Sequence, residues 1–182
     1  MDTKLDLVGT AASPLADGFD VLDVCHRQTL MALGKLSALV SRLASVGADA
    51  DVRALAEEIV QHFSQTARRH HEDEERHVFP ALIDGGDPDT VQAVLRLQQD
   101  HDWIEEDWTE LSPQLDALAA GQSWYDIDLI RAGAEIFTAL MHDHIALEES
   151  FIYPQARAQL GTVQRREMGR EMAARRRVER KR

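Results

Sequence analysis

Residues 70–80 read HHEDEERHVFP, and residues 144–154 read HIALEESFIYP. Aligned with each other, the two stretches match at a histidine, at two consecutive glutamates and at a proline, which are the pairs His70 and His144, Glu74 and Glu148, Glu75 and Glu149, and Pro80 and Pro154. A histidine and a glutamate four residues apart lie on the same face of a helix. The chain therefore contains two copies of an H-x-x-x-E pattern, each followed by an aromatic residue and a proline.

Outward from these stretches, the apolar residues have the spacing of amphipathic helices. Four long helices are predicted, at about 19–45, 51–83, 88–120 and 124–160, with a kink near Pro113 in the third. The turn signals between them are VGADAD, DGGDP and GQS, and Asp87 followed by Pro88 is typical of a helix start. No β-alternation of useful length is present. We expect an all-α protein, an antiparallel up-down-up-down four-helix bundle.

The remaining residues flank this bundle. We divide the chain into an N-terminal segment (1–18), the bundle (19–160) and a basic C-terminal helix or tail (161–182), with Thr162 as the cap of a short fifth helix. The tail contains nine Lys and Arg against three Glu, whereas the whole chain has a net charge of −12. We expect the tail to dock on the acidic body, and a tether to nucleic acid or to a membrane is the alternative.

Composition limits the partners. The acidic balance argues against nucleic acid, and the single cysteine, Cys25, rules out an internal disulfide framework and a metal site built from several thiolates. The N-terminus does not have the pattern of a signal peptide, and no apolar run was expected to reach the length of a membrane span. A cytoplasmic protein without a membrane partner is predicted.

Each of the other two long helices also carries a histidine, His26 in the first and His101 in the third. In antiparallel helices, residues equidistant from the connecting turn lie at the same level. Counted from the three turns, the four histidines share one layer of the bundle, and the two glutamates lie about 6 Å beyond it. The candidate metal ligands are His26, His70, Glu74, His101, His144 and Glu148.

The alternative interpretation is a solvated surface. It suits the residues that lie off this face, which we expect to be ordinary surface side chains: His62, His71, Glu72, Asp73, Glu75 and His142. It does not suit the six matched residues, because two buried carboxylates without partners would cost several kcal/mol each. A bound cation removes that cost. No tyrosine is expected beside the ligands.

Four imidazoles and two carboxylates without sulfur favour iron, with manganese or zinc as alternatives. A zincin is excluded because His71 and Glu72 are not followed by the required second histidine. A ferritin-like centre is excluded because only one E-x-x-H motif, Glu74 to His77, occurs here. If both glutamates bridge two metals, each ion gains two histidines and two carboxylate oxygens.

The pattern H…H-x-x-x-E…H…H-x-x-x-E resembles the hemerythrin-like (HHE cation-binding) family over about residues 19–160. This resemblance implies a four-helix bundle with a non-heme di-iron centre. It also implies that the four histidines are terminal ligands and that Glu74 and Glu148 are bridging ones. The oxygen carriers of the family have a fifth histidine on the third helix, where this chain has Glu105. Glu105 is therefore a candidate third carboxylate, and His77 is expected to line the pocket.

Several functions fit such a centre. The first is a module that binds or senses oxygen, nitric oxide or reactive oxygen species, with a small diatomic molecule or peroxide as the ligand. The second is a di-iron enzyme with peroxidase or catalase-like activity, and the third is an iron store or donor for iron–sulfur cluster repair. Whether the chain is an enzyme stays open. The missing fifth histidine predicts reaction with oxygen or peroxide in place of reversible oxygen carriage.

Overall fold

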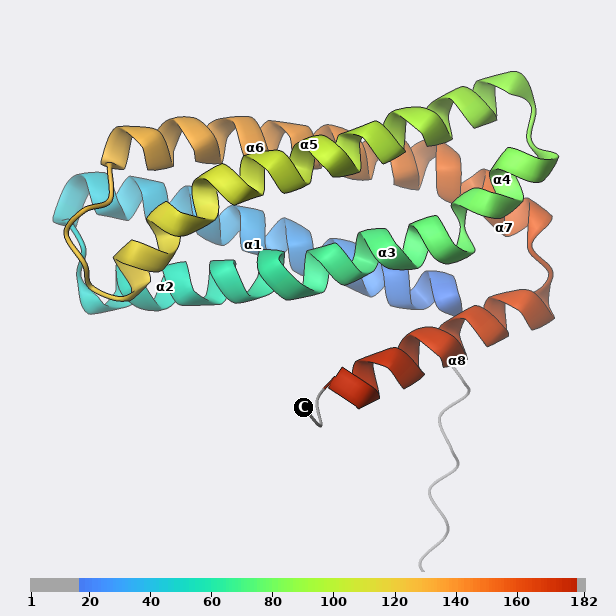
Figure 1. Ribbon diagram of the computed structural model, residues 1–182, viewed down its shortest axis with the longest axis horizontal. Coiled ribbons are helices and arrows are strands. Elements are labelled where there is room, and N and C mark those ends of the chain that lie inside the picture. Colours follow the sequence, from blue (N-terminus) through green and yellow to red (C-terminus); the bar gives the residue numbers. More distant parts are fainter. Residues whose placement is uncertain (1–16, 180–182) are drawn as a thin grey trace, which may run out of the picture.

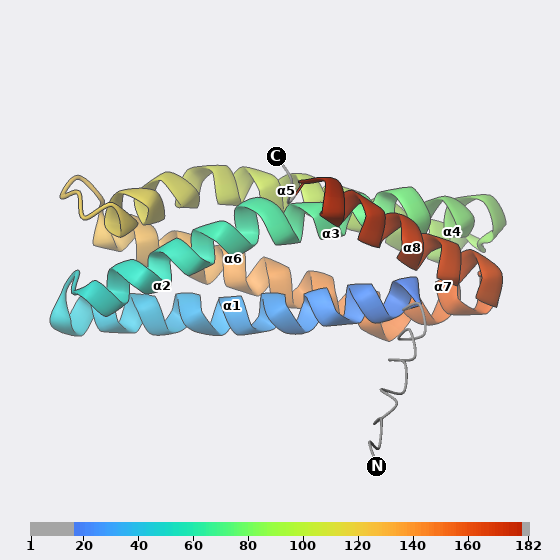
Figure 2. The ribbon, with the colours of Figure 1, turned by 90° about the horizontal axis from the view of Figure 1, so that it is seen from below.

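The structure, a computed structural model, describes residues 17–179. The expected N-terminal segment lies almost wholly outside this range, as do residues 180–182, and the division of the chain into three parts stays a prediction. All secondary structure in the described range is helical, which confirms the predicted all-α bundle. The long helices lie side by side along the long axis (Figures 1 and 2). In chain order the elements are α1 (Gly18–Val46), α2 (Ala50–Gln61), η1 (His62–Ala67), α3 (Arg68–His77), α4 (Phe79–Gly85), α5 (Pro88–Ala119), α6 (Ile127–Leu147), η2 (Glu148–Ile152), α7 (Tyr153–Gln159) and α8 (Thr162–Glu179).

Aspartates begin most of the long helices. The Asp87 carboxylate accepts hydrogen bonds from the backbone N–H groups of Asp89 and Thr90, so the predicted start of α5 is confirmed. The fourth long helix starts at Ile127 instead of Trp124. Asp126 caps α6, because its carboxylate accepts hydrogen bonds from the backbone N–H groups of Asp128 and Leu129. Pro113 lies inside α5, which continues through it as one helix.

Two of the predicted long helices are interrupted close to the repeated stretches. The π-helical segment η1 ends just before His70, and η2 begins at Glu148 itself. Such wide turns inside α-helices are frequent at functional sites. The helix of the first stretch also breaks at Val78, ahead of Pro80, whose ring cannot continue the hydrogen-bond ladder. The repeated sequence is thus also the place where the regular helices are distorted.

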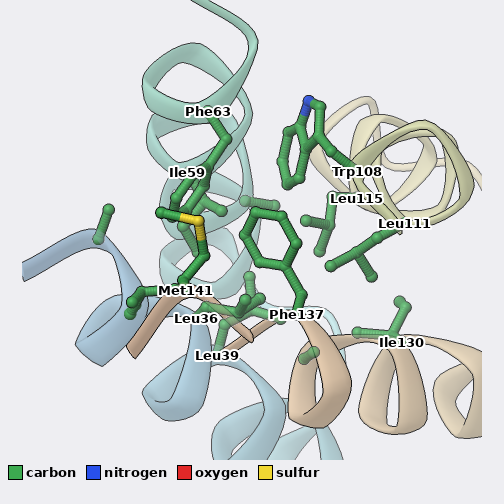
Figure 3. Packing of buried hydrophobic residues seen from close by; sticks show 14 of the residues in the cluster. Leu36, Leu39, Ile59, Phe63, Trp108, Leu111, Leu115, Ile130, Phe137 and Met141 are labelled. Carbon is green, nitrogen blue, oxygen red and sulfur yellow. The ribbon is translucent and has the colours of Figure 1, made fainter. Parts of the chain in front are cut away.

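The apolar core is divided into two clusters. The larger cluster fills one end of the bundle and includes Leu36, Phe63, Trp108 and Phe137, which pack together (Figure 3). The smaller cluster fills the other end and includes Phe19, Val78, Phe79, Leu97, Tyr153 and Met172. On α1, Leu22 belongs to the smaller cluster and Leu33 to the larger one. His26 lies between them in sequence, so the predicted histidine layer falls at the junction of two apolar regions.

The basic helix α8 packs on the outside of the bundle against α1, as expected for a docked tail (Figures 1 and 2). Its residues Met168 and Met172 are buried in the smaller cluster. A Cβ atom added to Gly18 would come within 2.4 Å of the Met168 side chain, so α1 begins with the residue that permits this close approach. The contact fixes α8 beside the histidine-rich segment α3.

Helix α1 is long and apolar enough to span a membrane by length and composition, contrary to the expectation that no apolar run reaches that length. The core helix of a soluble protein passes the same test. The buried positions of α1 contribute to both apolar clusters, and they include His26 and Thr29. They account for part of its apolar character, because Met31 and Val46 on the same helix are exposed.

Candidate metal centre

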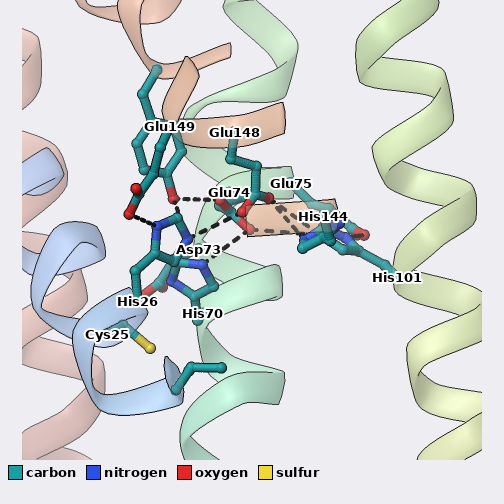
Figure 4. A network of polar contacts seen from close by, with 12 residues as sticks. Cys25, His26, His70, Asp73, Glu74, Glu75, His101, His144, Glu148 and Glu149 are labelled. Carbon is teal, nitrogen blue, oxygen red and sulfur yellow. Dashed lines mark hydrogen bonds and ion pairs between the residues drawn. The ribbon is translucent and has the colours of Figure 1, made fainter. Parts of the chain in front are cut away.

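The structure brings together all six residues that the sequence predicted as ligands. His26 comes from α1, His70 and Glu74 from α3, His101 from α5, His144 from α6 and Glu148 from the start of η2. The four histidines are between 1% and 6% exposed, and both glutamates are fully buried. Figure 4 shows the two glutamates between His26 and His70 on one side and His101 and His144 on the other. They form two groups of potential ligands that share both glutamates: site A (His26, His70, Glu74, Glu148) and site B (His101, His144, Glu74, Glu148).

The two carboxylates lie between these histidine pairs. Glu148 Oε2 is 3.1 Å from His26 Nε2 in site A, and Glu148 Oε1 is 2.9 Å from His144 Nε2 in site B. Glu74 Oε2 is 3.5 Å from His70 Nε2 and 3.6 Å from His101 Nε2. Each carboxylate therefore reaches both sites, which is the arrangement that a bridging ligand requires.

Many polar atoms at the centre lack a hydrogen-bond partner within the described part of the chain. These atoms are both ring nitrogens of His70 and His144, Nε2 of His71 and His101, Oε2 of Glu74, and both carboxylate oxygens of Glu148. Buried polar groups are normally paired, and leaving so many unpaired would be costly. Within each group of potential ligands, one ligand atom from every residue lies within 4.8 Å of the others, an arrangement that suits a bound cation. The donor set, nitrogen and carboxylate oxygen without sulfur, fits iron, manganese or zinc.

A second set of carboxylates holds the outer nitrogens of the histidines. His26 Nδ1 is 2.9 Å from Glu149 Oε1, and His101 Nδ1 is 2.8 Å from Glu75 Oε1. Asp100 Oδ2 makes a longer contact, 3.8 Å from His144 Nδ1. Such outer carboxylates fix the ring orientation and the tautomer that leaves the other nitrogen free for a metal. The prediction that Glu75 is an ordinary surface residue was wrong in this respect, although its side chain is half exposed.

Two aromatic rings cover the centre on the side of the smaller cluster. Phe79 stacks on His101 with 5.6 Å between ring centroids, and Tyr153 stacks on His26 at 5.2 Å. The Tyr153 hydroxyl donates a hydrogen bond to Glu74 Oε1 at 2.6 Å and lies 3.2 Å from His26 Nε2. Burial and the two nearby carboxylates raise the pKa of Tyr153 well above its usual range, so the phenol keeps its proton. The expectation that no tyrosine lies beside the ligands was wrong.

The π-helical turn explains that error. Tyr153 follows Glu148 by five residues, which places it on another face of a regular α-helix. In η2 the Tyr153 N–H instead bonds to the Glu148 carbonyl, the five-residue step of a π-turn. This wider turn carries both side chains to the inner face.

The interpretation of two further residues as surface side chains was also wrong. Asp73 is 2% exposed and pairs with Arg175 and Arg176, the second at 2.8 Å, so it anchors α8 to α3. The His71 ring stacks on His101 at 4.1 Å, and its Nε2 is buried. Half-buried His62 contacts Thr29, whereas Glu72 and His142 are exposed as expected.

Two residues considered beside the six predicted ligands lie elsewhere. Glu105, a candidate third carboxylate, is half exposed and pairs with Arg68 on the surface of the bundle. His77, which was expected to line the pocket, has its Nε2 2.8 Å from Glu171 Oε2 on α8. Neither residue belongs to a group of converging ligands, so Glu105 is not a third carboxylate of this centre.

The matched residues of the two stretches differ in protonation. Burial lowers the pKa of His70 well below its usual range, so this imidazole is neutral. Burial also acts against charge on His144, but the adjacent Glu148 carboxylate overrides it and raises the pKa to about 10. Burial raises the pKa of Glu74 to about 7, with the Glu148 charge adding to it. The pKa of Glu148 lies well below its usual range, because the His144 charge outweighs the effect of burial.

Two comparisons with known proteins match most of this chain. The model of the hemerythrin HHE cation-binding domain matches residues 17–156, which include all six converging residues. An uncharacterized protein of Haemophilus influenzae is 34% identical over 159 residues, which covers 87% of this chain and 90% of that protein.

Proposed function

This chain belongs to the hemerythrin HHE cation-binding family, and we propose that its centre holds two iron ions, with manganese or zinc as alternatives. The proposed ligands are His26 and His70 in site A, His101 and His144 in site B, and Glu74 and Glu148 in both. The observation that carries this proposal is the position of Glu148, whose two oxygens face the histidines of different sites. The proposed up-down-up-down order of the helices accounts for the common level of the histidines.

We further propose that the centre binds or senses a small oxidant or diatomic molecule: oxygen, nitric oxide or a peroxide. Paired iron supplies open coordination positions and one-electron steps for such ligands. The protein supplies the surroundings. The two apolar clusters on either side of the centre exclude water, and Glu75 and Glu149 hold the histidine rings in place. An acidic protein with this centre needs neither nucleic acid nor a membrane, and we propose a cytoplasmic location.

One observation favours an enzyme as the second candidate. The Tyr153 O–H group is buried next to site A and already donates to Glu74. A proton donor at hydrogen-bond distance from a ligand can assist the reduction of peroxide, as a general acid does. Peroxidase or catalase-like activity is therefore the alternative to binding and sensing. An iron store or donor for cluster repair has no comparable observation in its favour, because the proposed ligands are buried and release of iron needs access to them.

Anaerobic titration with ferrous iron tests the main proposal. We expect about two iron ions per chain, measured by elemental analysis after desalting. The loaded protein should then be exposed in separate samples to oxygen, hydrogen peroxide and nitric oxide, with optical spectra taken before and after purging with argon. One ion or none per chain would contradict the di-iron proposal. Rapid turnover of peroxide with release of oxygen would instead support the catalase-like alternative.

Thermal unfolding gives an independent measurement. A ligand that binds only the native state stabilises it by about 2.7 kcal/mol when its free concentration is 100 times its Kd. We expect the iron-loaded protein to melt at a higher temperature than the metal-free protein, because the ions satisfy buried groups that otherwise face one another unpaired. Equal melting temperatures would place the bound iron at the surface instead of the centre.

A further inference from the structure

His71 lies beside the proposed centre but is not part of the ligand set predicted from the sequence. Its Nε2 is buried and has no hydrogen-bond partner within the described residues. Ligand atoms of His71, His101 and His144 lie within 4.8 Å of one another, a third group of potential ligands next to the two that define sites A and B. The ring centroid of His71 is 4.1 Å from that of His101 and 5.3 Å from that of His144.

From this arrangement we infer that His71 is a third histidine ligand of the ion in site B. The inference rests on the proposed di-iron function and specifies how the two ions differ. His71 is grouped with the two histidines of site B, and these two histidines are grouped with both glutamates. With His71 added to its four residues, site B would have five protein donors, three imidazoles and two carboxylates, whereas site A would have four. An iron ion that prefers six ligands then has one free position in site B and two in site A. Site A is the place where a small ligand is expected to bind.

His70 and His71 are consecutive residues of helix α3, yet each can bind a different ion because α3 lies beside both sites. Neighbouring positions on an α-helix are about 100° apart around its axis. The centroid of the His70 ring lies 4.6 Å from that of His26 in site A, whereas the His71 ring lies beside His101 and His144 in site B. The two rings of α3 are 5.8 Å apart. Each imidazole therefore faces a different histidine pair.

The repeat shows that this third imidazole is present on one side only. In the second stretch, the position that matches His71 is Ile145, an apolar residue of the larger core cluster. Ile145 offers no lone pair, so the second stretch cannot supply an equivalent ligand. The Glu105 carboxylate also cannot supply it, because that side chain pairs with Arg68 on the surface. His71 would therefore be the additional ligand for which Glu105 was a candidate.

The test compares His71→Gln with a matched control, His142→Gln, an exposed histidine on α6. Each protein is titrated with ferrous iron under anaerobic conditions. In the His71 variant we expect one of the two binding constants, that of the ion in site B, to fall by about 10-fold or more, with no change of either constant in the control. Mössbauer spectra of protein loaded with the isotope 57Fe should show two unequal iron environments in the wild type, and the signal of one of them should change in the variant.

A second variant separates a ligand from a packing residue. In His71→Ala, added free imidazole can enter the space left by the ring, and we expect it to restore the wild-type Mössbauer signal and the lost affinity. His71→Ile, which copies the residue of the second stretch, fills the space without a donor and should not respond to imidazole. If either variant does not fold, as judged by circular dichroism of the metal-free protein, the other provides the measurement.

The outcomes distinguish the two proposals. Wild-type protein that binds fewer than two ions would contradict the di-iron function itself. Wild-type protein that binds two ions, together with folded His71 variants of unchanged affinity and unchanged Mössbauer spectra, would leave that function intact and overturn the role of His71. A loss of affinity that imidazole does not restore in His71→Ala would show that the ring only packs against His101, and would likewise overturn it.

Discussion

Sites A and B are built on the same plan but differ at two positions. In each site one histidine contacts a glutamate and an aromatic ring from the same repeated stretch. In site A, Glu149 and Tyr153 contact His26. In site B, Glu75 and Phe79 contact His101. The first difference is the ring: Tyr153 at site A has a hydroxyl, whereas the matching Phe79 at site B has none. The second difference is His71, which lies beside site B and is matched in the second stretch by the apolar Ile145.

With the proposed ligands, a repeated scaffold would hold two unequal ions. The matched residues support both sites in the same way. The unmatched residues would make the sites differ in reactivity, because His71 would add a donor to site B and the Tyr153 hydroxyl holds a proton beside site A.

The largest effect is expected from Glu148→Gln. An amide has one oxygen and one NH2 group, so it cannot reach ions in both sites as the carboxylate does. We expect the variant to lose at least one of the two iron ions, measured by elemental analysis, while Glu72→Gln on the exposed face of α3 retains both. The metal-free variant should unfold at a lower temperature than the wild type, because His144 loses the buried carboxylate with which it is paired. Full iron loading of folded Glu148→Gln would show that this residue does not bridge.

The pH dependence tests the difference between His70 and His144. His144, with a pKa of about 10, must release its proton before it can bind a metal, whereas His70 is already neutral. Below about pH 7 a proton on Glu74 must also be displaced. Metal affinity should therefore fall as the pH is lowered, by about tenfold per pH unit for each proton released, and more steeply below pH 7.

Calorimetric titration with metal in two buffers of different ionisation enthalpy measures this proton release directly. We expect at least about one proton per chain near pH 8, and a larger number near pH 6. Proton release that is absent at both values would contradict the protonation of His144 in the metal-free protein.

A smaller effect is expected from the outer glutamates. In Glu149→Gln the amide can still accept a hydrogen bond from His26 but carries no charge, and metal affinity should fall by about 10- to 100-fold. Glu75→Gln should weaken binding through His101 by a similar factor, since the two contacts differ by only 0.1 Å in length. A large loss of metal affinity in one variant and none in the other would contradict the proposal that the two glutamates have equivalent roles.

The residues that the sequence predicted and those it missed differ in a physical way. The six proposed ligands followed from spacing within a helix and from distance to a turn, which are properties of the chain alone. His71 and Tyr153 were missed because their contacts depend on how far each helix is rotated. The turns η1 and η2 change that rotation close to both stretches. One signal was available, since the repeat matches Glu75 with Glu149, which indicated that neither is an ordinary surface residue.

Tyr153→Phe makes site A resemble site B. Loss of the hydroxyl leaves Glu74 Oε1 without its donor, at a cost of about 1–3 kcal/mol in the free energy of unfolding of the metal-free protein. Iron loading should persist, because the tyrosine is not a proposed ligand, while the rate of reaction with peroxide should fall by about tenfold. Stopped-flow spectra measure this rate. The control is Phe79→Tyr, which places a hydroxyl at the matched position over site B. In the double variant with Tyr153→Phe and Phe79→Tyr, we expect the rate of reaction with peroxide to stay low.

The smallest effect is expected at Glu105, the position that the sequence offered as a candidate third carboxylate. If this side chain reached the ions, Glu105→His would supply the fifth histidine of the oxygen carriers and would favour reversible oxygen binding. The structure places it in an exposed ion pair with Arg68, and such pairs contribute about 0–1 kcal/mol to stability. We therefore expect Glu105→His to leave iron loading, the Mössbauer spectrum and the optical response to oxygen unchanged. An oxygen-dependent band that appears in the variant and bleaches on purging would show that position 105 reaches site B. That result would also contradict the assignment of the fifth histidine to position 71.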